Sequence, residues 1–420
     1  MADSTPNSTA TRATPPADPT YFRKGFGLKA AVEGDLASDY DGRLVDLLRE
    51  REYALTAGDT TVRLAREFGF CYGVERAVEY AYQTRKKFPE RRIFLAGEII
   101  HNPHINQKLR EMGIIFLTHT PAPNGSSFDF SAVQPNDVVI LPAFGVTVTD
   151  FELLRELGCV MVDTTCGSVL NVWKRVEGYA RDGFTALIHG KYYHEETRAT
   201  ASQAMKYPGG HYLIVRDMSE ARLICDYLEG KCSATDIAEK FAHAASPDFD
   251  PERDLTKIGV ANQTTMLARE SLAIGAEVRA AMLRARGEEH TASHFRTFDT
   301  ICSATQDRQD AVRELLDESP TVMVVVGGYN SSNTISLAAL CGERVTTYHV
   351  EDAQCIDPET GVIHHRVQQG REDVATPEWL AHPGPVRVGL TAGASTPNNK
   401  IADAVARIFA TRGIDPATVR

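Results

Sequence analysis

Short apolar runs alternate with amphipathic stretches along most of this chain. The runs rich in Val, Ile and Leu begin after Thr60 and are RRIFLAGEI, DVVILPAF, CVMVDTTC, FTALIHG, HYLIV, KIGVANQ, TVMVVVGG, RVTTYHV and VRVGLTAG. Strand-like runs separated by helix-like stretches are typical of βα units and predict mainly parallel sheets. The stretch after Cys71 supports this, because its apolar residues Val74, Ala77, Val78 and Ala81 recur at helical spacing. The pattern therefore predicts an α/β fold.

Three cysteines, Cys71, Cys166 and Cys302, each follow a strand-like run and open a helix-like one. The chain between successive cysteines has the length of a small α/β domain. We expect three such domains, arranged pseudo-threefold. Their predicted bounds are 74–165, 166–300 with an insert near 231–254, and 301–420 together with 59–73. Before them we expect a disordered N-terminus over 1–20, rich in Ser, Thr and Pro, and a helical extension over 21–58.

The position of these cysteines suggests metal chemistry. Ligands gather at the C-terminal ends of parallel strands, where helices also point their positive ends, and such a place favours thiolate. If the three units pack around one axis, three thiolates converge and suit a 4Fe-4S cluster with one iron free of protein ligands. A buried structural thiol is the alternative for any single cysteine. We assign that structural role to the cysteines outside such junctions, Cys159, Cys225, Cys232, Cys341 and Cys355.

Two turns have the composition of a phosphate-binding site. In VVVGGYNSSNTISLAALCGE, Ser331, Ser332 and Asn333 fall at a predicted helix N-terminus, where hydroxyl, amide and free backbone N–H groups can bind an anion. A second turn, TAGASTPNNKIADAV, places Ser395 or Thr396 as the helix cap and Pro397 in the first turn. Ordinary capping would need only one polar residue in each.

Further strand-end loops carry groups that can bind phosphate or move protons. For any one of them a solvated loop side chain is the alternative. The loops contribute His101 and His104 in GEIIHNPHINQ, His189, His194, Glu195 and Glu196 in LIHGKYYHEET, and Gln263, Thr264 and Thr265 in ANQTTM.

Charge and composition narrow the class of protein. The formal net charge of -11 argues against a nucleic-acid binder that works through a general basic field. We find no apolar run of about 18 residues, so no membrane partner is expected. The first residues lack the apolar block of a secretory signal, and the eight cysteines are dispersed, as in reduced cytoplasmic proteins.

In combination, the motifs GFCYGVERAV, EIIHNP, LPAFGV, DTTCGSV, HGKYYHEET, NQTTM, GGYNSSNT and TAGAST resemble the 4-hydroxy-3-methylbut-2-enyl diphosphate reductases, especially the plant and cyanobacterial branch. The resemblance implies three α/β domains around a central 4Fe-4S cluster held by Cys71, Cys166 and Cys302. It also implies that Glu196 and Thr264 act in catalysis. The implied substrate-binding residues are His101, His194, Thr264, Thr265, Ser331, Ser332, Asn333 and Ser395.

The implied activity is an iron–sulfur oxidoreductase reaction, the last step of the methylerythritol phosphate route of isoprenoid biosynthesis. It removes the hydroxyl group of 4-hydroxy-3-methylbut-2-enyl diphosphate and forms isopentenyl and dimethylallyl diphosphate, with electrons from a donor such as ferredoxin or flavodoxin. One departure is Phe144 in AFGV, where many bacterial members have a diphosphate-binding histidine. Three other hypotheses stay open from the residues alone: an iron–sulfur hydro-lyase, a redox or diphosphate sensor, and a structural α/β protein.

Overall fold

The computed structural model describes residues 20–120, 125–298, 300–367 and 373–419, and in them strands and helices alternate along the chain. The predicted disordered segment 1–20 therefore lies, except for its last residue, outside the described residues. Three separate sheets form, and their central strands pair in parallel because helices connect them and cover their faces. Among the described residues, no helix combines the length and the apolar character that crossing a membrane requires.

The first sheet has the strand order β1-β7-β6-β4-β5, and every neighbouring pair is parallel. Its inner strands are mainly apolar and are buried along their whole length, because both faces of the sheet are covered. The strands are β1 (Tyr21–Phe22), β4 (Ile93–Ala96), β5 (Ile114–Leu117), β6 (Val138–Leu141) and β7 (Val160–Asp163). The helices of this unit are α3 (Tyr72–Lys87), α4 (Pro103–Glu111) and α5 (Val148–Leu157).

The second sheet is also fully parallel, in the order β11-β10-β8-β9. Its strands are β8 (Thr185–His189), β9 (Tyr212–Val215), β10 (Ile258–Asn262) and β11 (Phe295–Thr297). Its helices are α6 (Gly167–Arg181), α7 (Glu195–Ala204), α8 (Met218–Leu228) and α11 (Ala268–His294), with the short α9 (Ala234–Phe241) and α10 (Pro251–Asp254) between β9 and β10. The segment predicted as an insert, 231–254, contains these two short helices.

The third sheet has the order β14-β15-β13-β12-β17-β3-β2, with β16 paired to β15. Its centre is parallel, whereas β2 and the group β14 to β16 pair antiparallel at the two edges. Its strands are β2 (Ala54–Ala57), β3 (Thr60–Leu64), β12 (Val322–Val326), β13 (Thr347–Val350), β14 (Ile356–Asp357), β15 (Val362–Arg366), β16 (Asp373–Pro377) and β17 (Val386–Ala392). Its helices are α12 (Ser303–Asp317), α13 (Ser332–Gly342) and α14 (Asn398–Thr411), with single 3-10 turns at Ala353–Cys355 and Pro416–Thr418.

The predicted helical extension, 21–58, contains α1 (Lys29–Tyr40) and α2 (Arg43–Glu50), but also the strands β1 and β2. These two strands tie the extension to the first and third sheets. Helix α1 packs against α3 of the first unit, and α2 packs against α14 of the third. The extension is thus built into two of the three units.

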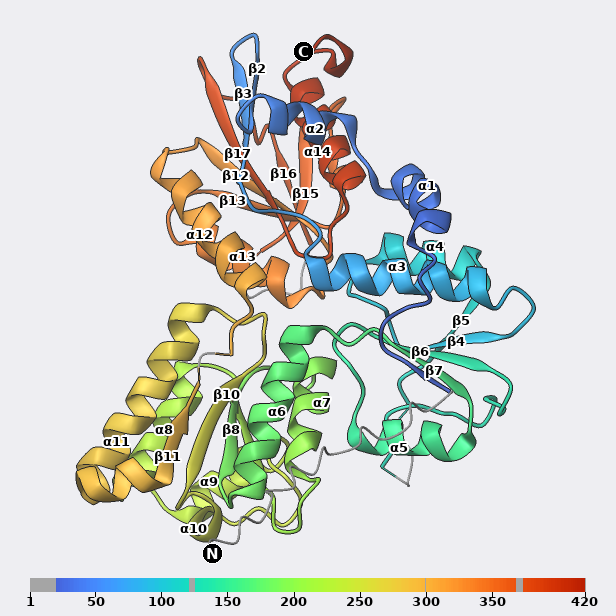
Figure 1. The fold of residues 1–420 in the computed structure, drawn as a ribbon. Coiled ribbons are helices and arrows are strands. Elements are labelled where there is room, and N and C mark those ends of the chain that lie inside the picture. Colours follow the sequence, from blue (N-terminus) through green and yellow to red (C-terminus); the bar gives the residue numbers. More distant parts are fainter. Residues whose placement is uncertain (1–19, 121–124, 299, 368–372, 420) are drawn as a thin grey trace, which may run out of the picture.

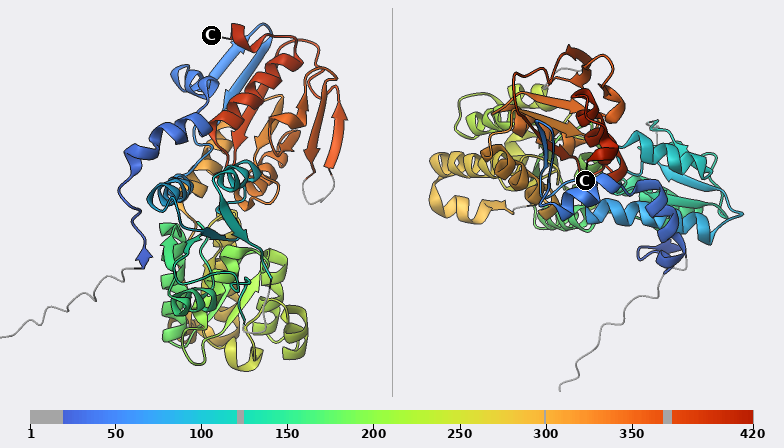
Figure 2. Two further views of the ribbon diagram at one scale, coloured as in Figure 1. Left: turned by 90° about the vertical axis from the view of Figure 1, so that its right-hand side faces the viewer. Right: turned by 90° about the horizontal axis from the view of Figure 1, so that it is seen from above.

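Figures 1 and 2 show three units side by side around a common centre, each with its own sheet and helices. Each unit also has its own apolar core, and in the first and third units this core consists of two clusters on the two faces of the sheet. The predicted domain bounds remain a proposal, which these three sheets support. The arrangement directs several strand-end loops towards the centre, and the candidate site lies there.

Candidate active site

A single cavity where the three units meet is lined by every residue that the sequence assigned to catalysis, metal binding or substrate binding. About 710 Å³ of space free of protein atoms, part of it open to solvent, lies between these residues. Its lining comes from the loops after β3, β4, β6, β7, β8, β10, β11, β12 and β17. Of the other candidates among these loops, His104, His189, Glu195 and Gln263 do not line it, and His189 instead pairs with the Ser271 hydroxyl at 2.8 Å.

The three cysteines occupy equivalent local positions. Each is the N-cap residue of a helix that begins at the cavity. These are Cys71 of α3 in the first unit, Cys166 of α6 in the second and Cys302 of α12 in the third. Gly73 lets two of them come close. A Cβ added there would lie 2.6 Å from the Cys166 sulfur and 3.9 Å from the Cys71 sulfur. The Cys302 sulfur accepts a hydrogen bond from the Thr305 N–H at 3.3 Å.

The electrostatics of these thiols suit a metal better than free thiolates. Burial raises the pKa of Cys302 to about 11. Burial also raises the pKa of Cys71, while the Arg308 guanidinium opposes the shift. The sulfurs of Cys71 and Cys302 therefore hold their protons unless a metal takes the place of the proton, as coordination does. Three soft sulfur donors at one cavity with apolar lining fit an iron–sulfur cluster. The other five cysteines do not line this cavity.

Arg308 is a site residue that the sequence did not reveal. It is buried on α12, and its guanidinium donates to the carbonyl oxygens of Gly69 at 2.7 Å and Phe70 at 3.1 Å. It therefore fixes the loop that ends in Cys71, from the helix that begins after Cys302. No sequence signal marks this contact, because the two segments lie in distant parts of the chain.

Glu196 is a buried carboxyl group in the first turn of α7. It is only 3% exposed, and its Oε1 accepts a hydrogen bond from the Thr264 N–H at 2.6 Å. Burial raises its pKa to about 7, although the bonds from Thr264 and the charge of His101 oppose the shift. Gln263 fixes the neighbouring backbone, since its Oε1 accepts from the Lys191 N–H and the Thr197 hydroxyl. A carboxyl group with this pKa can deliver a proton near neutral pH.

His101 lies between two carboxylates. Its Nδ1 is 3.0 Å from Glu98 Oε2, and its Nε2 is 3.3 Å from Glu195 Oε2. Burial alone would lower the pKa of His101, but Glu195 and Glu98 outweigh it and raise the pKa to about 9. The ring is thus an imidazolium at neutral pH. Glu98 is absent from the predicted set, and Glu195 was predicted only as a polar group of its loop, not as a partner of His101. Glu98 could have been found, since it precedes His101 by three residues in GEIIH.

Phe144 stacks on this imidazolium. The two ring centroids are 4.8 Å apart and the planes are inclined by 15°. Phe144 therefore supports His101 with an aromatic face, which attracts a cation. His194 approaches the same ring edge-on at 5.0 Å.

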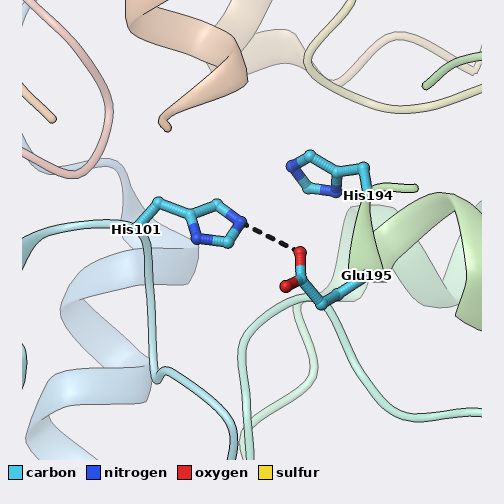
Figure 3. Close-up of side chains that lie close together, drawn as sticks. All are labelled: His101, His194 and Glu195. Carbon is cyan, nitrogen blue, oxygen red and sulfur yellow. Dashed lines mark ion pairs between the residues drawn. The ribbon is translucent and has the colours of Figure 1, made fainter. Parts of the chain in front are cut away.

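His194 is the N-cap residue of α7, and its Nδ1 accepts a hydrogen bond from the Glu196 N–H at 3.1 Å. Burial, and then the positive His101, lower the pKa of His194 to about 3. The ring is therefore neutral, and because Nδ1 accepts, the proton resides on Nε2. Figure 3 shows the His194 ring beside His101 and Glu195. The two histidines together offer N–H donors, as anion binding requires.

The serine–asparagine turn and the turn that contains Ser395 line the cavity beside His101, and the Ser395 hydroxyl lies 3.4 Å from the His101 carbonyl oxygen. Ser331 caps α13, and the Ser395 hydroxyl donates to Ser331 Oγ at 3.3 Å. Asn333 Oδ1 accepts from the Ala394 N–H at 2.8 Å and so joins the two turns. Among the described residues, no group pairs with the buried Ser332 Oγ or Asn333 Nδ2. Buried polar atoms rarely stay unpaired, so these two are available to a polar ligand.

One detail of the second turn differs from the sequence prediction. Pro397, expected in the first turn of α14, is itself the N-cap residue, and no side chain caps the helix. The Thr396 hydroxyl donates to the Val326 carbonyl at 3.0 Å instead. The predicted capping role of Ser395 or Thr396 is therefore wrong, and the Ser395 hydroxyl is directed to Ser331.

Comparison with known proteins places the chain among well-described relatives. The sequence pattern of the LytB protein family matches residues 62–409. The chain is 46% identical over 395 residues to a 4-hydroxy-3-methylbut-2-enyl diphosphate reductase of Gloeobacter violaceus, covering 94% of this chain and 93% of that protein. It is 47% identical over 391 residues to the protein of that name from a Nostoc species, covering 93% and 94%.

Two solved structures are similar to the fold. One is the E-1-hydroxy-2-methyl-but-2-enyl-4-diphosphate reductase of Plasmodium falciparum, with a TM-score of 0.60 at 21% identity, covering 83% of this chain and 87% of that one. The other is an (E)-4-hydroxy-3-methyl-but-2-enyl diphosphate reductase described as the terminal enzyme of the non-mevalonate pathway. Its TM-score is 0.50 at 27% identity, covering 84% and 99%. These likenesses confirm the predicted α/β fold with mainly parallel sheets.

Proposed function

This chain belongs to the LytB protein family, and from that membership we propose that it is an oxidoreductase that reduces 4-hydroxy-3-methylbut-2-enyl diphosphate. One observation carries the proposal. A single cavity contains three cysteine thiols, a buried carboxyl group with a pKa near neutrality, and a set of hydrogen-bond donors suited to a diphosphate. The reaction is the terminal step of the non-mevalonate route to isoprenoids, as it is for the relatives.

The overall reaction needs two electrons and two protons. It breaks the bond between carbon and the hydroxyl oxygen, releases water, and leaves isopentenyl or dimethylallyl diphosphate. Reductases of this family are iron–sulfur enzymes, and we propose that Cys71, Cys166 and Cys302 hold one 4Fe-4S cluster. When bound, the cluster supplies the electrons and a Lewis-acidic iron for the hydroxyl oxygen.

The chain's own residues have two tasks. Glu196 holds a proton close to the reacting end and gives it to the leaving oxygen, because hydroxide is a far poorer leaving group than water. Thr264 keeps this carboxyl in place through its N–H group, and Thr265 lines the cavity beside it. At the other end, the proposed diphosphate ligands are His101, His194, Ser331, Ser332, Asn333 and Ser395. Their binding energy fixes the reacting carbon near the thiols, and so contributes to rate rather than only to affinity.

The donor of electrons and the location of the protein are further proposals. We propose a small redox protein such as ferredoxin or flavodoxin as the donor, since electrons must come from outside the chain. All eight cysteines are unpaired thiols, which is typical of proteins in a reducing cytoplasm. We therefore propose that the protein works there.

An anaerobic preparation tests the function directly. The purified protein should contain iron and sulfide, absorb visible light, and consume the hydroxylated allylic diphosphate only when a reductant is supplied. Loss of substrate without a reductant would instead point to a hydro-lyase. Absence of iron after anaerobic purification and reconstitution would contradict the proposed cluster.

A further inference from the structure

A carboxylate stands in contact with the proposed diphosphate-binding histidines. Glu195 opens α7, and its Oε2 lies 3.3 Å from Nε2 of His101, a contact drawn as a dashed line in Figure 3. His101 comes from the loop after β4 in the first unit, so the ion pair joins two units. The His101 side chain is 12% exposed, whereas that of Glu195 is 40% exposed. Glu195 therefore approaches the buried imidazolium from the solvent side.

The chemistry of this cluster selects an anion as its ligand. One nitrogen each of His101 and His194 and an oxygen of Glu195 lie within 4.8 Å of one another, as in many metal sites. A metal ion, however, needs a free lone pair on each ring. Both nitrogens of His101 face carboxylates, and His194 accepts the Glu196 N–H on Nδ1, so its other nitrogen carries a proton. The rings therefore present N–H groups, and the anion that they now meet is Glu195.

We propose that Glu195 is an internal competitor of the substrate: its carboxylate occupies the anion position on His101 in the free enzyme and leaves when the diphosphate binds. This inference rests on the function proposed above. The contact with His101 is an ion pair without the alignment of a good hydrogen bond, since His101 Nε2 has no partner by hydrogen-bond geometry among the described residues. A diphosphate oxygen that enters along the N–H direction is a better acceptor.

The surroundings leave room for the displaced carboxylate. Glu195 lines two further cavities, a wide one that also borders His101, Lys191 and Arg366, and a small one that borders Arg198, whose guanidinium also donates to Ser127 Oγ at 3.1 Å. Arg198 follows Glu195 by three residues on α7, a spacing at which side chains meet on one helix face. The carboxylate can therefore exchange the His101 imidazolium for the Arg198 guanidinium and remain paired.

The exchange has a use in the catalytic cycle. Substrate and product carry the same diphosphate and differ only at the other end, so strong diphosphate binding would also retain the product. A resident carboxylate lowers the affinity for both and returns to His101 as the product leaves. It also keeps the buried imidazolium paired while the site is empty, which avoids the cost of an uncompensated buried charge.

Titration of the holoenzyme with inorganic diphosphate tests the exchange. In calorimetry at constant pH and salt, Glu195→Gln should bind diphosphate about five- to tenfold more tightly than wild type, because the amide keeps the shape but not the competing charge. Glu98→Gln removes the carboxylate paired with Nδ1 of His101, the ring nitrogen that does not meet Glu195. This variant should bind diphosphate more weakly. Glu343→Gln removes a carboxylate of similar exposure that pairs with Arg269 and does not line the cavity, and should leave the affinity unchanged.

The outcomes separate this inference from the function on which it rests. A wild-type protein that turns over with a reductant, but whose diphosphate affinity is equal or weaker after Glu195→Gln, would overturn the exchange alone. A wild-type protein that neither binds diphosphate nor turns over would overturn the proposed function, and the exchange with it. Should the glutamine variant fold poorly, Glu195→Ala must show the same tightening.

Discussion

Replacing Glu196 with glutamine separates proton delivery from every other task of the site. Glutamine has nearly the same shape, and its Oε1 can still accept the Thr264 N–H that now lies 2.6 Å from the carboxylate. The iron content and the diphosphate affinity should therefore persist. The proton is lost, and loss of a general acid lowers turnover by a factor of about 100 or more, equivalent to about 3 kcal/mol in the barrier.

The same substitution has a stability effect whose sign follows from the pKa. The pKa of this carboxyl group is 4.5 for an unperturbed glutamate and about 7 in the folded protein, mainly because of burial. Between these pH values the folded state keeps a proton that the unfolded state has released, so the free energy of unfolding falls as the pH rises. Above pH 7 the penalty is constant at about 3 kcal/mol, and below the ordinary pKa it vanishes. Glutamine never carries this penalty.

Two measurements check the reasoning. The wild-type turnover number at saturating substrate should fall as the pH rises through about 7, while the residual rate of Glu196→Gln should not depend on pH in that range. In thermal unfolding, the variant should gain a few degrees over wild type at pH 8 but not at pH 4.5. Glu343→Gln is the matched control and should change neither. A variant that turns over at the wild-type rate would place the proton donor elsewhere.

Three further substitutions probe the rest of the cavity. Cys166→Ser should lose most of the iron and the activity, and full iron content with full activity would remove this cysteine from the proposed cluster. Gly73→Ala should load less iron and sulfide, because its Cβ would lie 2.6 Å from the Cys166 sulfur; normal loading would refute that close approach. Asn333→Ala should weaken binding of substrate and of inorganic diphosphate alike, by about tenfold for one lost hydrogen bond to a charged group, and unchanged calorimetric affinity would contradict the role of this amide.

The central strands could be predicted because their apolar composition indicates that they are buried. β12, with the sequence VMVVV, is buried at every position, and such a run leaves few alternatives to a strand inside a parallel sheet. The edges could not be predicted in this way. β1 has only two residues, Tyr21 and Phe22, and it is a strand because it pairs with Met161 and Val162 far along the chain. Pairing of this kind leaves no local signal.

The candidate site shows the same difference between residues that the sequence reveals and residues whose roles depend on pairing across the fold. Cysteines that open helices after strand-like runs form a repeat that can be seen in the sequence, and the family resemblance named the histidines and the serine–asparagine turn. Arg308 was missed, and Glu195 was named only as a polar group of its loop and not as a partner of His101, because both roles exist only across unit boundaries. Both are charged residues of the kind that solvent-exposed helix surfaces ordinarily carry. Only the packing of the units gives them partners.

The assembly of the site from three units has a consequence for how it can work. No two of the proposed sulfur ligands belong to one compact motif, so the three thiols come together only when all three units are packed around the cavity. The diphosphate donors are divided in the same way, with His101 in the first unit, His194 in the second and Asn333 in the third. A bound diphosphate must therefore contact all three units at once. The His101–Glu195 ion pair already joins two of them in the free protein, and its exchange for the substrate lets the ligand complete the contacts that hold the reacting end in place.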